Sequence, residues 1–366
     1  MKKILVTGAG KIGATIAAFL SGTDDYAVTL VDHDQDRLDR ADAAGVARYR
    51  ADLGTEGALD KIMQGQYAVL SAAPYALTTR IATAAAKAGV HYLDLTEDVA
   101  STRSVRALAA TAGTAFIPQC GLAPGFVSIV AHDIAQKFDR LDTIHLRVGA
   151  LPEFPSNALG YNLTWSTDGV INEYIEPCEA IVDGHKRLVP ALEECETLGV
   201  DGVTYEAFNT SGGLGSLCET YDGAVRELNY RTIRYPGHAQ IMKILLQDLR
   251  LSERRAVLKD IMEHAVPLTD QDMVLIFVSV TGWKNGQLTQ ESFVRRVYAA
   301  SVQGQPRTAI QITTAGAICA VLDLLAQGRI PQHGLLRQED IPLALFLENR
   351  FGAFYQGGRT GRLKAA

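Results

Sequence analysis

The sequence has no excess of positive charge. Its 35 lysine and arginine residues are outnumbered by 41 aspartate and glutamate residues, which gives a formal net charge of -6. The basic residues are scattered rather than clustered. Because proteins that bind nucleic acids need a basic surface to neutralise phosphates, this composition argues against DNA or RNA as a main partner.

Cysteine is scarce and follows no pattern. The five cysteines are odd in number, widely spaced and without a CxxC pair: Cys120, Cys178, Cys195, Cys218 and Cys319. We therefore expect no disulfide framework, and a reducing cytoplasm is the expected location. The histidines other than His238 have no metal-ligand spacing, so no metal site is predicted.

Long hydrophobic runs are also missing. No uninterrupted stretch of about 18 apolar residues is present, so we expect no membrane span. No charged region followed by an apolar run precedes the first expected strand, which argues against a secretory signal. With 47% hydrophobic and 21% charged residues, the composition is that of a folded protein with a large core.

The first 120 residues alternate short apolar runs with helical patterns. Expected strands cover residues 4–6, 28–31, 68–70, 91–93 and 115–117, and expected helices cover 11–21, 77–88 and 102–110. Apolar strands that alternate with helices predict an α/β fold, a doubly wound parallel Rossmann sheet with helices on both faces.

The pattern changes after Gly125. Residues 143–148 and 273–281 alternate as half-exposed strands, and residues 295–301 are expected to pair with the second of them. Residues 313–326 form an apolar helix that we expect to return to the first domain. We predict a Rossmann domain from residues 1–124 plus 312–366, with an inserted α+β substrate-binding and dimerisation domain from 125–311.

A glycine loop follows the first expected strand. It consists of Gly8-Ala9-Gly10-Lys11-Ile12-Gly13. Gly8 permits a tight turn, Gly10 lets the backbone approach a pyrophosphate, and Gly13 lets the helix pack on the strand. The amide groups of Lys11 and Ile12 would then face the phosphates. A glycine turn without a ligand is the alternative.

Acidic residues after the next strands refine this interpretation. Asp32 ends the second expected strand, 19 residues beyond Gly13, where a carboxylate binds ribose hydroxyls and repels the 2′-phosphate of NADP. NAD is therefore the predicted cofactor, although Asp32 could instead cap a turn. Asp52 could lie near the adenine or cap a helix. Small residues leave room for the dinucleotide after the strand at 68–70: Ser71, Ala72 and Pro74.

Three further segments are rich in reactive groups. In residues 92–98, Asp94 and Glu97 could act as a general base, or Thr96 or Asp98 could simply cap a helix. In residues 119–125, Gly121 and Gly125 would let the backbone approach a nicotinamide ring, and Gly121 and Pro124 are predicted to bind the cofactor.

Cys120 and the third segment supply candidate substrate contacts. Cys120 is either a substrate contact or a packing residue. In residues 230–238, Arg234 could grip a carboxylate and His238 could move a proton, unless both are solvated.

With these segments, the chain resembles the saccharopine dehydrogenase family. The resemblance rests on residues 8–13, 71–75, 92–98, 121–125, 165–174 and 234–238. It implies a Rossmann domain with an inserted domain that binds substrate and forms a homodimer. It also implies hydride transfer between a nicotinamide cofactor and a carbon bonded to nitrogen in a lysine-derived substrate.

Two positions depart from the pattern of saccharopine reductases. Ala123 stands where they typically carry an aspartate, and Asp168 stands where they carry an arginine that holds a carboxylate. Residues 165–174 and 234–238 are more similar to lysine 6-dehydrogenases, and Asp32 agrees with a preference for NAD.

The resulting hypothesis is oxidation of the ε-carbon of L-lysine. Glu97 or Asp94 is the first choice as proton acceptor and His238 the second. Arg234 would bind the α-carboxylate. Further substrate contacts are assigned to Tyr75, Cys120, Tyr161, Trp165 and Tyr235. The alternatives are a saccharopine dehydrogenase with altered contacts, and a non-catalytic NAD-binding sensor or assembly subunit.

Overall fold

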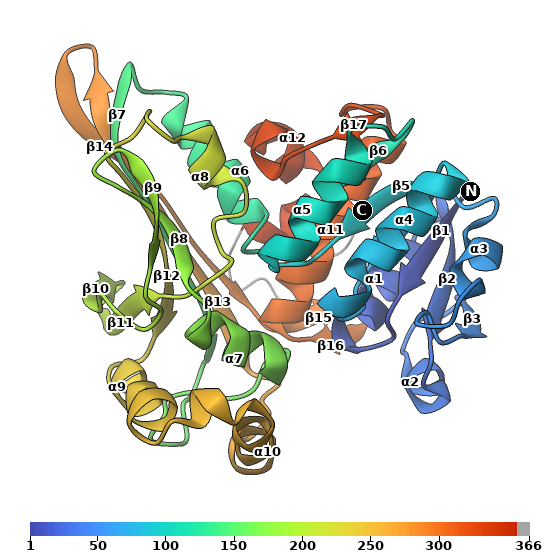
Figure 1. Cartoon of the computed structure of the whole chain (residues 1–366), viewed down its shortest axis with the longest axis horizontal. Coiled ribbons are helices and arrows are strands. Elements are labelled where there is room, and N and C mark those ends of the chain that lie inside the picture. The colour runs from blue at the N-terminus through green and yellow to red at the C-terminus, as the bar shows by residue number, and fades with distance from the viewer. Residues whose placement is uncertain (357–366) are drawn as a thin grey trace. The chain divides into compact units, whose positions relative to one another are not determined.

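The computed structural model describes residues 1–356, which form two compact units (Figure 1). The first unit contains Met1–Ile129 and Gln311–Gln356, and the second contains Val130–Ile310. The divisions lie at 129/130 and 310/311, both inside helices, and the sequence-based prediction set them at 124/125 and 311/312. The end of the predicted first domain, residues 357–366, lies outside the described residues.

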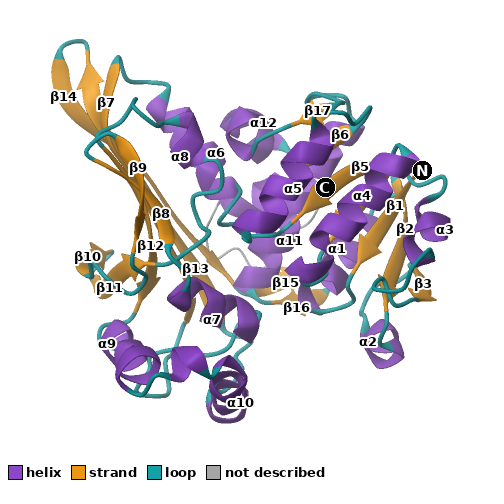
Figure 2. Cartoon of the chain, viewed as in Figure 1, coloured by secondary structure: helices purple, strands orange, loops and turns teal. Residues whose placement is uncertain are grey.

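The first unit is built on a seven-stranded parallel sheet (Figure 2). Its strand order is β17-β6-β5-β4-β1-β2-β3. The strands are β1 (Lys2–Thr7), β2 (Tyr26–Asp32), β3 (Ala47–Arg50), β4 (Ala68–Ser71), β5 (His91–Asp94), β6 (Ala115–Ile117) and β17 (Gly334–Leu335). The strand order reverses between β1 and β4, and such a reversal is where doubly wound folds bind ligands.

Helices cover both faces of this sheet. On one face, α3 (Ala58–Met63), α4 (Thr78–Ala88) and α5 (Val99–Ala109) pack on alternate strand residues such as Leu5 and Phe116. On the other face lie α1 (Lys11–Ser21) and α11 (Ala309–Ala326), where the Cys319 thiol contacts the Ile16 carbonyl. The remaining elements are α2 (Gln35–Arg40), α12 (Leu343–Glu348) and the 3-10 turns η1 (Tyr75–Leu77), η4 (Gln338–Asp340) and η5 (Gly352–Gln356).

The second unit contains an eight-stranded mixed sheet. Its main path is β10-β11-β12-β7-β13-β14, with β8 paired to β12 and β9 paired to β8. The strands are β7 (Arg140–Pro152), β8 (Cys178–Val182), β9 (His185–Val189), β10 (Glu196–Val200), β11 (Val203–Asn209), β12 (Glu227–Arg234), β13 (Asp272–Lys284) and β14 (Gln287–Tyr298). Only the β12–β7 pair is parallel among the described strands of this sheet. A short hairpin, β15 (Ala300–Val302) and β16 (Gln305–Arg307), follows it.

Helices of the second unit enclose a separate apolar core. This core joins Tyr161 and Leu163 to residues of α7 (Thr167–Ile175), α9 (His238–Lys243) and α10 (Arg255–Ala265). The other helical elements are α6 (Phe126–Ala135), which crosses the division between the units, α8 (Leu217–Thr220), the π-helix η2 (Ile244–Asp248) and η3 (Leu251–Glu253). The core packs beside the carboxyl end of β12, because Ala239 and Met242 follow that strand closely in the chain.

The predicted fold class is confirmed: a parallel Rossmann sheet accompanies a second domain with a mixed sheet. The expectation that the chain has no membrane span stays a prediction. Among residues 1–356, one helix, α11, is long and apolar enough by length and composition to cross a membrane. Of the 18 residues of this helix, 83% are buried, which is typical of a core helix. Polar residues such as Thr313 and Asp323 interrupt the run that a simple scan requires.

Candidate functional site

The glycine loop between β1 and α1 is too tight for side chains. Gly8 has a φ of +92°, and a Cβ on it would lie 2.6 Å from the Ala72 carbonyl oxygen. A Cβ on Gly13 would overlap the carbonyl oxygen of Gly8. A Cβ on Gly10, by contrast, would meet no heavy atom within 4 Å, so the space above this residue is open.

The start of α1 suits an anion. Its N-cap residue, Gly10, offers no side chain to its amides, and no acidic residue stands in the first turn. The amides of Lys11 and Ile12 therefore lie at the positive end of a helix that nothing in the first turn neutralises. A tight turn, an open glycine and an uncapped helix start together fit a dinucleotide pyrophosphate.

Asp32 ends β2 beside this loop. Its Oδ2 accepts a hydrogen bond from the Ala9 amide at 2.7 Å, and its Oδ1 accepts one from the Asp34 amide at 2.9 Å. The imidazole of His33 lies 3.0 Å from Oδ1. Oδ2 accepts one hydrogen bond and can accept a second, so Asp32 can hold the glycine loop and still accept a ribose hydroxyl.

Two residues, Asp52 and Arg50, bear on the predicted binding site for the adenosine of the dinucleotide. Asp52 accepts a hydrogen bond from the Gly54 amide at 2.8 Å, which gives it the role of capping a turn. Its contact with adenine stays a prediction. Arg50 stands directly beside Asp32 in the β2–β3 register, and its Nε donates to the His33 carbonyl at 3.1 Å. This neighbour was not predicted from the sequence, because the short strand β3 was not expected.

The segment after β4 lies against the glycine loop. The Ala72 amide donates to the Thr7 carbonyl at 2.9 Å, so Ala72 closes one side of the turn at Gly8. Ser71 is buried at the strand end, Pro74 begins the turn η1, and Tyr75 is half exposed. The small residues predicted here are thus adjacent to the loop at the β1/β4 reversal.

Asp94 ends β5 and is fully enclosed within the first unit. Its carboxylate accepts three hydrogen bonds, from the Thr96 amide, the Gln119 amide and the Tyr92 hydroxyl. Burial raises its pKa to about 6. These bonds tie β5 to the loop after β6, so the geometry favours a structural role over the proton transfer expected from the sequence.

Glu97 has a different environment. It is partly buried, and among residues 1–356 its side chain makes no hydrogen bond or ion pair with another residue; its carboxylate faces only its own backbone amide. Burial, together with the charges of Asp98 and Asp94, raises its pKa. Asp98 caps α5 by accepting from the Ser101 amide at 2.7 Å. Glu97 is therefore the carboxylate of this segment with a free acceptor and increased basicity.

The loop of residues 119–125 folds tightly on itself. The Gly121 amide donates to the Pro124 carbonyl at 3.1 Å, and a Cβ on Gly125 would overlap the Gly121 carbonyl oxygen. The Cys120 thiol is buried and donates to the Ile117 carbonyl at 3.0 Å. Gln338 donates to the same sulfur at 3.1 Å. These contacts favour a packing role for Cys120 over the predicted contact with substrate.

The second unit holds a buried arginine. Arg234 ends β12 and is 2% exposed. Its Nε donates to the Tyr174 hydroxyl at 2.9 Å, and its Nη1 donates to the Ile233 carbonyl at 2.9 Å. Nη2 makes no hydrogen bond, and no carboxylate lies within ion-pair distance of the guanidinium, among residues 1–356. A buried cation with a free donor edge is suited to an anionic ligand.

His238 begins α9 next to this arginine. Its Nδ1 lies 2.9 Å from the Leu159 carbonyl, and its Nε2 lies 3.0 Å from the Tyr174 hydroxyl. Burial and the charge of Arg234 lower the pKa of His238 to about 3. The ring is thus neutral near pH 7 with both nitrogens engaged. This arrangement favours a positioning role over the proton transfer expected from the sequence.

Aromatic residues lie around Arg234. The Tyr161 ring lies 4.9 Å from the guanidinium carbon, which is a cation–π distance. Trp165 packs against Gly169, where a Cβ would overlap the indole. Three buried oxygens of this segment lack a hydrogen bond of normal geometry: Tyr161 Oη, Asn162 Oδ1 and Thr164 Oγ1. Buried polar atoms without partners are expected where a ligand or water binds.

Tyr235, the remaining predicted substrate contact, points away from Arg234. Its hydroxyl donates to the Pro152 carbonyl at 3.0 Å, and its ring lies 5.6 Å from that of Tyr205 in a second core cluster. Adjacent residues of an extended chain face opposite sides, which explains the separation. Asp168 is exposed and pairs with Lys259 at 2.6 Å.

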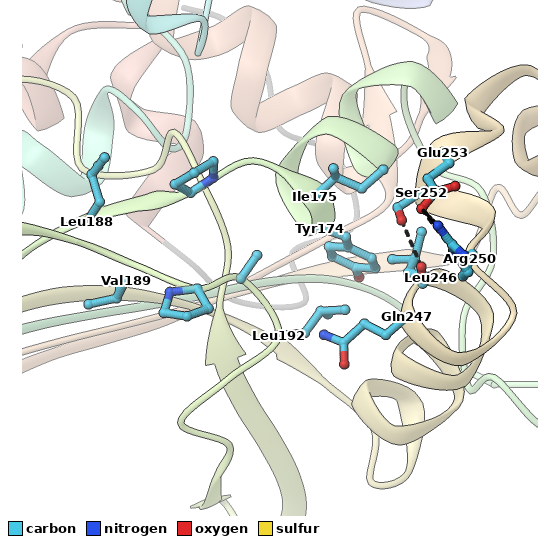
Figure 3. A pocket seen from close by; sticks show the side chains of 13 residues that line it. Tyr174, Ile175, Leu188, Val189, Leu192, Leu246, Gln247, Arg250, Ser252 and Glu253 are labelled. Carbon is cyan, nitrogen blue, oxygen red and sulfur yellow. Dashed lines mark hydrogen bonds and ion pairs between the residues drawn. The ribbon is translucent and has the colours of Figure 1, made fainter.

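A cavity of about 700 Å³ lies beside Tyr174 within the second unit (Figure 3). It is lined by the end of α7, the chain from Leu188 to Leu192, and residues from Leu246 to Glu253. The hydroxyl of Tyr174 bonds to Arg234 and His238, so this ring belongs to both the cavity wall and the arginine site. The volume is in the range of small-molecule sites.

Two residues of this site were not predicted individually. Tyr174 lies in a segment that carries the family resemblance, but a helical tyrosine gives no signal of its own. Glu173 precedes it, and its charge acts on Arg234, Tyr161 and Tyr230. Among residues 1–356, all cysteines are free and no group of three His, Cys, Asp or Glu could hold a metal ion.

Comparisons with known proteins place this architecture in a family. Residues 4–117 match the model of the saccharopine dehydrogenase NADP binding domain, and residues 121–349 match that of the saccharopine dehydrogenase C-terminal domain. The mitochondrial alpha-aminoadipic semialdehyde synthase of Bos taurus is 23% identical over 319 residues, covering 82% of this chain and 34% of that protein.

The saccharopine dehydrogenase [NADP(+), L-glutamate-forming] of Saccharomyces cerevisiae is 25% identical over 183 residues, covering 46% of this chain and 40% of that protein. The chain thus spans between about a third and two fifths of the length of these two curated relatives.

Solved structures share the fold. The apo saccharopine dehydrogenase (L-Glu forming) of Saccharomyces cerevisiae superposes with a TM-score of 0.78 at 17% identity, covering 96% of this chain and 98% of that one. The homospermidine synthase of Legionella pneumophila, solved in complex with NAD, gives a TM-score of 0.71 at 12% identity, covering 98% and 90%. The chain belongs to the saccharopine dehydrogenase family, whose members are oxidoreductases that act on CH–NH groups of amino-acid derivatives.

Proposed function

We propose that this member of the saccharopine dehydrogenase family is an NAD-dependent dehydrogenase that oxidises the ε-carbon of L-lysine or a closely similar amine. One observation carries the proposal most directly. Arg234 is buried among aromatic rings with its Nη2 edge free, which suits the α-carboxylate of an amino acid with an alkyl chain.

The cofactor would be held by the first unit. The uncapped start of α1 and the open space above Gly10 fit the pyrophosphate, and Asp32 would accept the ribose hydroxyls. A carboxylate at that position supports NAD over NADP, because it repels a 2′-phosphate. When bound, the nicotinamide would supply the acceptor for a hydride.

The protein must remove a proton from the ε-ammonium and bind the α-carboxylate of the substrate. The ε-ammonium must lose a proton before the ε-carbon can release a hydride. Glu97 is the proposed acceptor because its carboxylate makes no hydrogen bond or ion pair with another described residue and its pKa is raised. Loss of the proton and the hydride leaves an iminium, which water converts to the semialdehyde and ammonia. Arg234 would hold the α-carboxylate throughout, which restricts the position of the ε-carbon.

A saccharopine dehydrogenase activity is the second candidate. The name of the Saccharomyces cerevisiae relative favours it. Two observations in this chain disfavour it, because Ala123 supplies no carboxylate and Asp168 is an exposed partner of Lys259 rather than a carboxylate-binding arginine.

A substrate panel tests the proposal. NAD reduction is followed by absorbance with L-lysine, saccharopine, L-ornithine and pentane-1,5-diamine at equal concentrations. We expect the highest kcat/KM with L-lysine. Preference for saccharopine would establish the second candidate, and no reduction with any amine, despite measurable NAD binding, would establish a non-catalytic protein.

A further inference from the structure

The hydrogen bonds around Arg234 have a defined direction. The Leu159 carbonyl can only accept, so Nδ1 of His238 carries the proton and donates to it. The ring is neutral, so Nε2 is an acceptor and the Tyr174 hydroxyl donates to it. The oxygen of Tyr174 then accepts from Nε of Arg234. Four groups thus form one chain with a single consistent direction.

This chain fixes the orientation of the guanidinium. Nε is held by Tyr174 and Nη1 by the Ile233 carbonyl, so two of the three nitrogens are engaged. The Tyr161 ring lies 4.9 Å from the guanidinium carbon and limits rotation of the plane. The edge at Nη2 is the part left to a ligand. An arginine side chain otherwise has many rotamers, and their loss on binding weakens affinity.

His238 is itself held in place. It is 2% exposed, its ring stacks on Phe208 at 6.1 Å with an interplanar angle of 10°, and its edge meets Tyr161 at 5.5 Å. The preceding turn is fixed because Glu206 accepts from the amides of Gly237 and Ala239. The far end of the chain is therefore anchored to the backbone on both sides of the ring.

We infer that Tyr174 and His238 are positioning residues, which hold Arg234 so that its free edge binds the carboxylate of an amino-acid substrate. This inference rests on the proposed function for the identity of the ligand. Neither residue needs to exchange a proton with the substrate. Their effect is expected on substrate affinity rather than on the chemical step.

Steady-state kinetics of Tyr174→Phe provides the first test. The variant keeps the ring and removes the hydroxyl that joins Arg234 to His238. We expect KM for L-lysine to rise about tenfold with kcat nearly unchanged, as for loss of one hydrogen bond to a charged group. With pentane-1,5-diamine, which lacks the carboxylate, KM should change by less than about twofold.

Two further variants make this test specific. Tyr205→Phe removes a buried tyrosine hydroxyl that faces another arginine, Arg296, outside the site, and it should leave KM unchanged. In an Arg234→Gln background, Tyr174→Phe should have no additional effect on KM, because its partner is absent. Equal effects on lysine and the diamine, or additive effects in the double variant, would overturn the positioning role.

A second measurement does not depend on turnover. NMR of protein labelled with ¹⁵N-histidine, with His238 assigned by its loss in His238→Gln, reports the tautomer directly. We expect a neutral ring protonated at Nδ1 at pH 6, and a shifted Nε2 resonance in Tyr174→Phe. Protonation of both nitrogens at pH 6, or an Nε2 resonance that Tyr174→Phe leaves unchanged, would refute the chain.

The two measurements separate the failure of each claim. If the NMR signature is found but L-lysine is not oxidised, the proposed function fails and the hydrogen-bonded chain stands. If lysine is oxidised but the NMR signature is absent, the function stands and the positioning role is wrong.

Discussion

The candidate sites of the two units consist of different groups, mainly backbone in the first unit and side chains in the second. In the first unit, the candidate dinucleotide site consists mainly of backbone: the turn at Gly8, the open space at Gly10 and the amides at the start of α1. In the second unit, the site around Arg234 consists of side chains. Tyr161, Tyr174 and His238 come from three separate segments and meet through hydrogen bonds and ring contacts.

This difference predicts how each site responds to mutation. A backbone site tolerates no added atoms but needs no particular side-chain chemistry apart from Asp32. A side-chain site tolerates small changes of volume but depends on each donor and acceptor. Substitutions can therefore test whether the two sites differ as described.

The largest effect is expected in the glycine loop. Gly13→Ala should destabilise the first unit and abolish NAD binding, because its Cβ would overlap the Gly8 carbonyl oxygen. Gly10→Ala should leave the fold nearly unchanged, yet weaken NAD binding by about 100-fold if the pyrophosphate occupies the open space. Fluorescence titration with NAD and thermal unfolding measure the two effects.

Gly199→Ala serves as the matched control, because it also has open space but lies in β10 of the second unit. Unchanged NAD affinity in Gly10→Ala would show that the pyrophosphate binds elsewhere.

The next effect concerns the arginine of the second unit. Arg234→Gln should raise KM for L-lysine by about 100-fold, which corresponds to loss of a buried, charge-assisted contact. NAD affinity should not change. Arg295→Gln, which removes an exposed arginine of the same unit, is the control. An unchanged KM for lysine in Arg234→Gln would show that Arg234 does not bind the α-carboxylate of the substrate.

A smaller effect is expected at Asp32. Asp32→Asn keeps an oxygen for the Ala9 amide and removes the negative charge. We expect the preference for NAD over NADP to fall by about tenfold. Adding Arg50→Gln should then lower the use of NADP, because Arg50 stands beside position 32. Unaltered cofactor preference in Asp32→Asn would assign the choice of cofactor to other residues.

The last effect concerns stability rather than ligand binding, and it is the pH dependence contributed by Asp94. Its pKa is raised by burial to about 6 in the folded chain and is about 3.8 in the unfolded one. The folded state therefore binds more protons between these values, and the stabilisation from this group is lost as pH rises from about 4 to 6. Relative to Asp94→Asn, the wild type should lose about 1 to 3 kcal/mol of unfolding free energy over that range. Chemical denaturation at several pH values would measure this loss; an equal pH dependence in both proteins would contradict it.

Much of the first unit could be predicted from the sequence. The helix expected at residues 11–21 agrees with α1, and the five predicted strands coincide with β1, β2, β4, β5 and β6. Buried parallel strands are continuous apolar runs, so they stand out locally. The strand β3 was missed, because its four residues, Ala-Arg-Tyr-Arg, are all exposed and give no apolar signal.

The site of the second unit could be predicted only in part. Arg234, Tyr161 and Trp165 were identified as candidates, but Tyr174 was not, because its role depends on a contact with a residue 60 positions away. The environment of His238 could not be predicted either. Its pKa of about 3 results from burial and from the nearby arginine, and neither is visible in the local sequence.

The most direct measurement uses L-lysine that carries deuterium at both ε-carbon hydrogens. The enzyme is incubated with NAD, and the reduced cofactor is analysed by mass spectrometry and proton NMR. We expect one deuterium in the reduced cofactor for each lysine oxidised, together with a lower turnover rate than with unlabelled lysine. Reduced cofactor without deuterium would place the oxidised carbon elsewhere, and the absence of any reduction would contradict the proposed reaction.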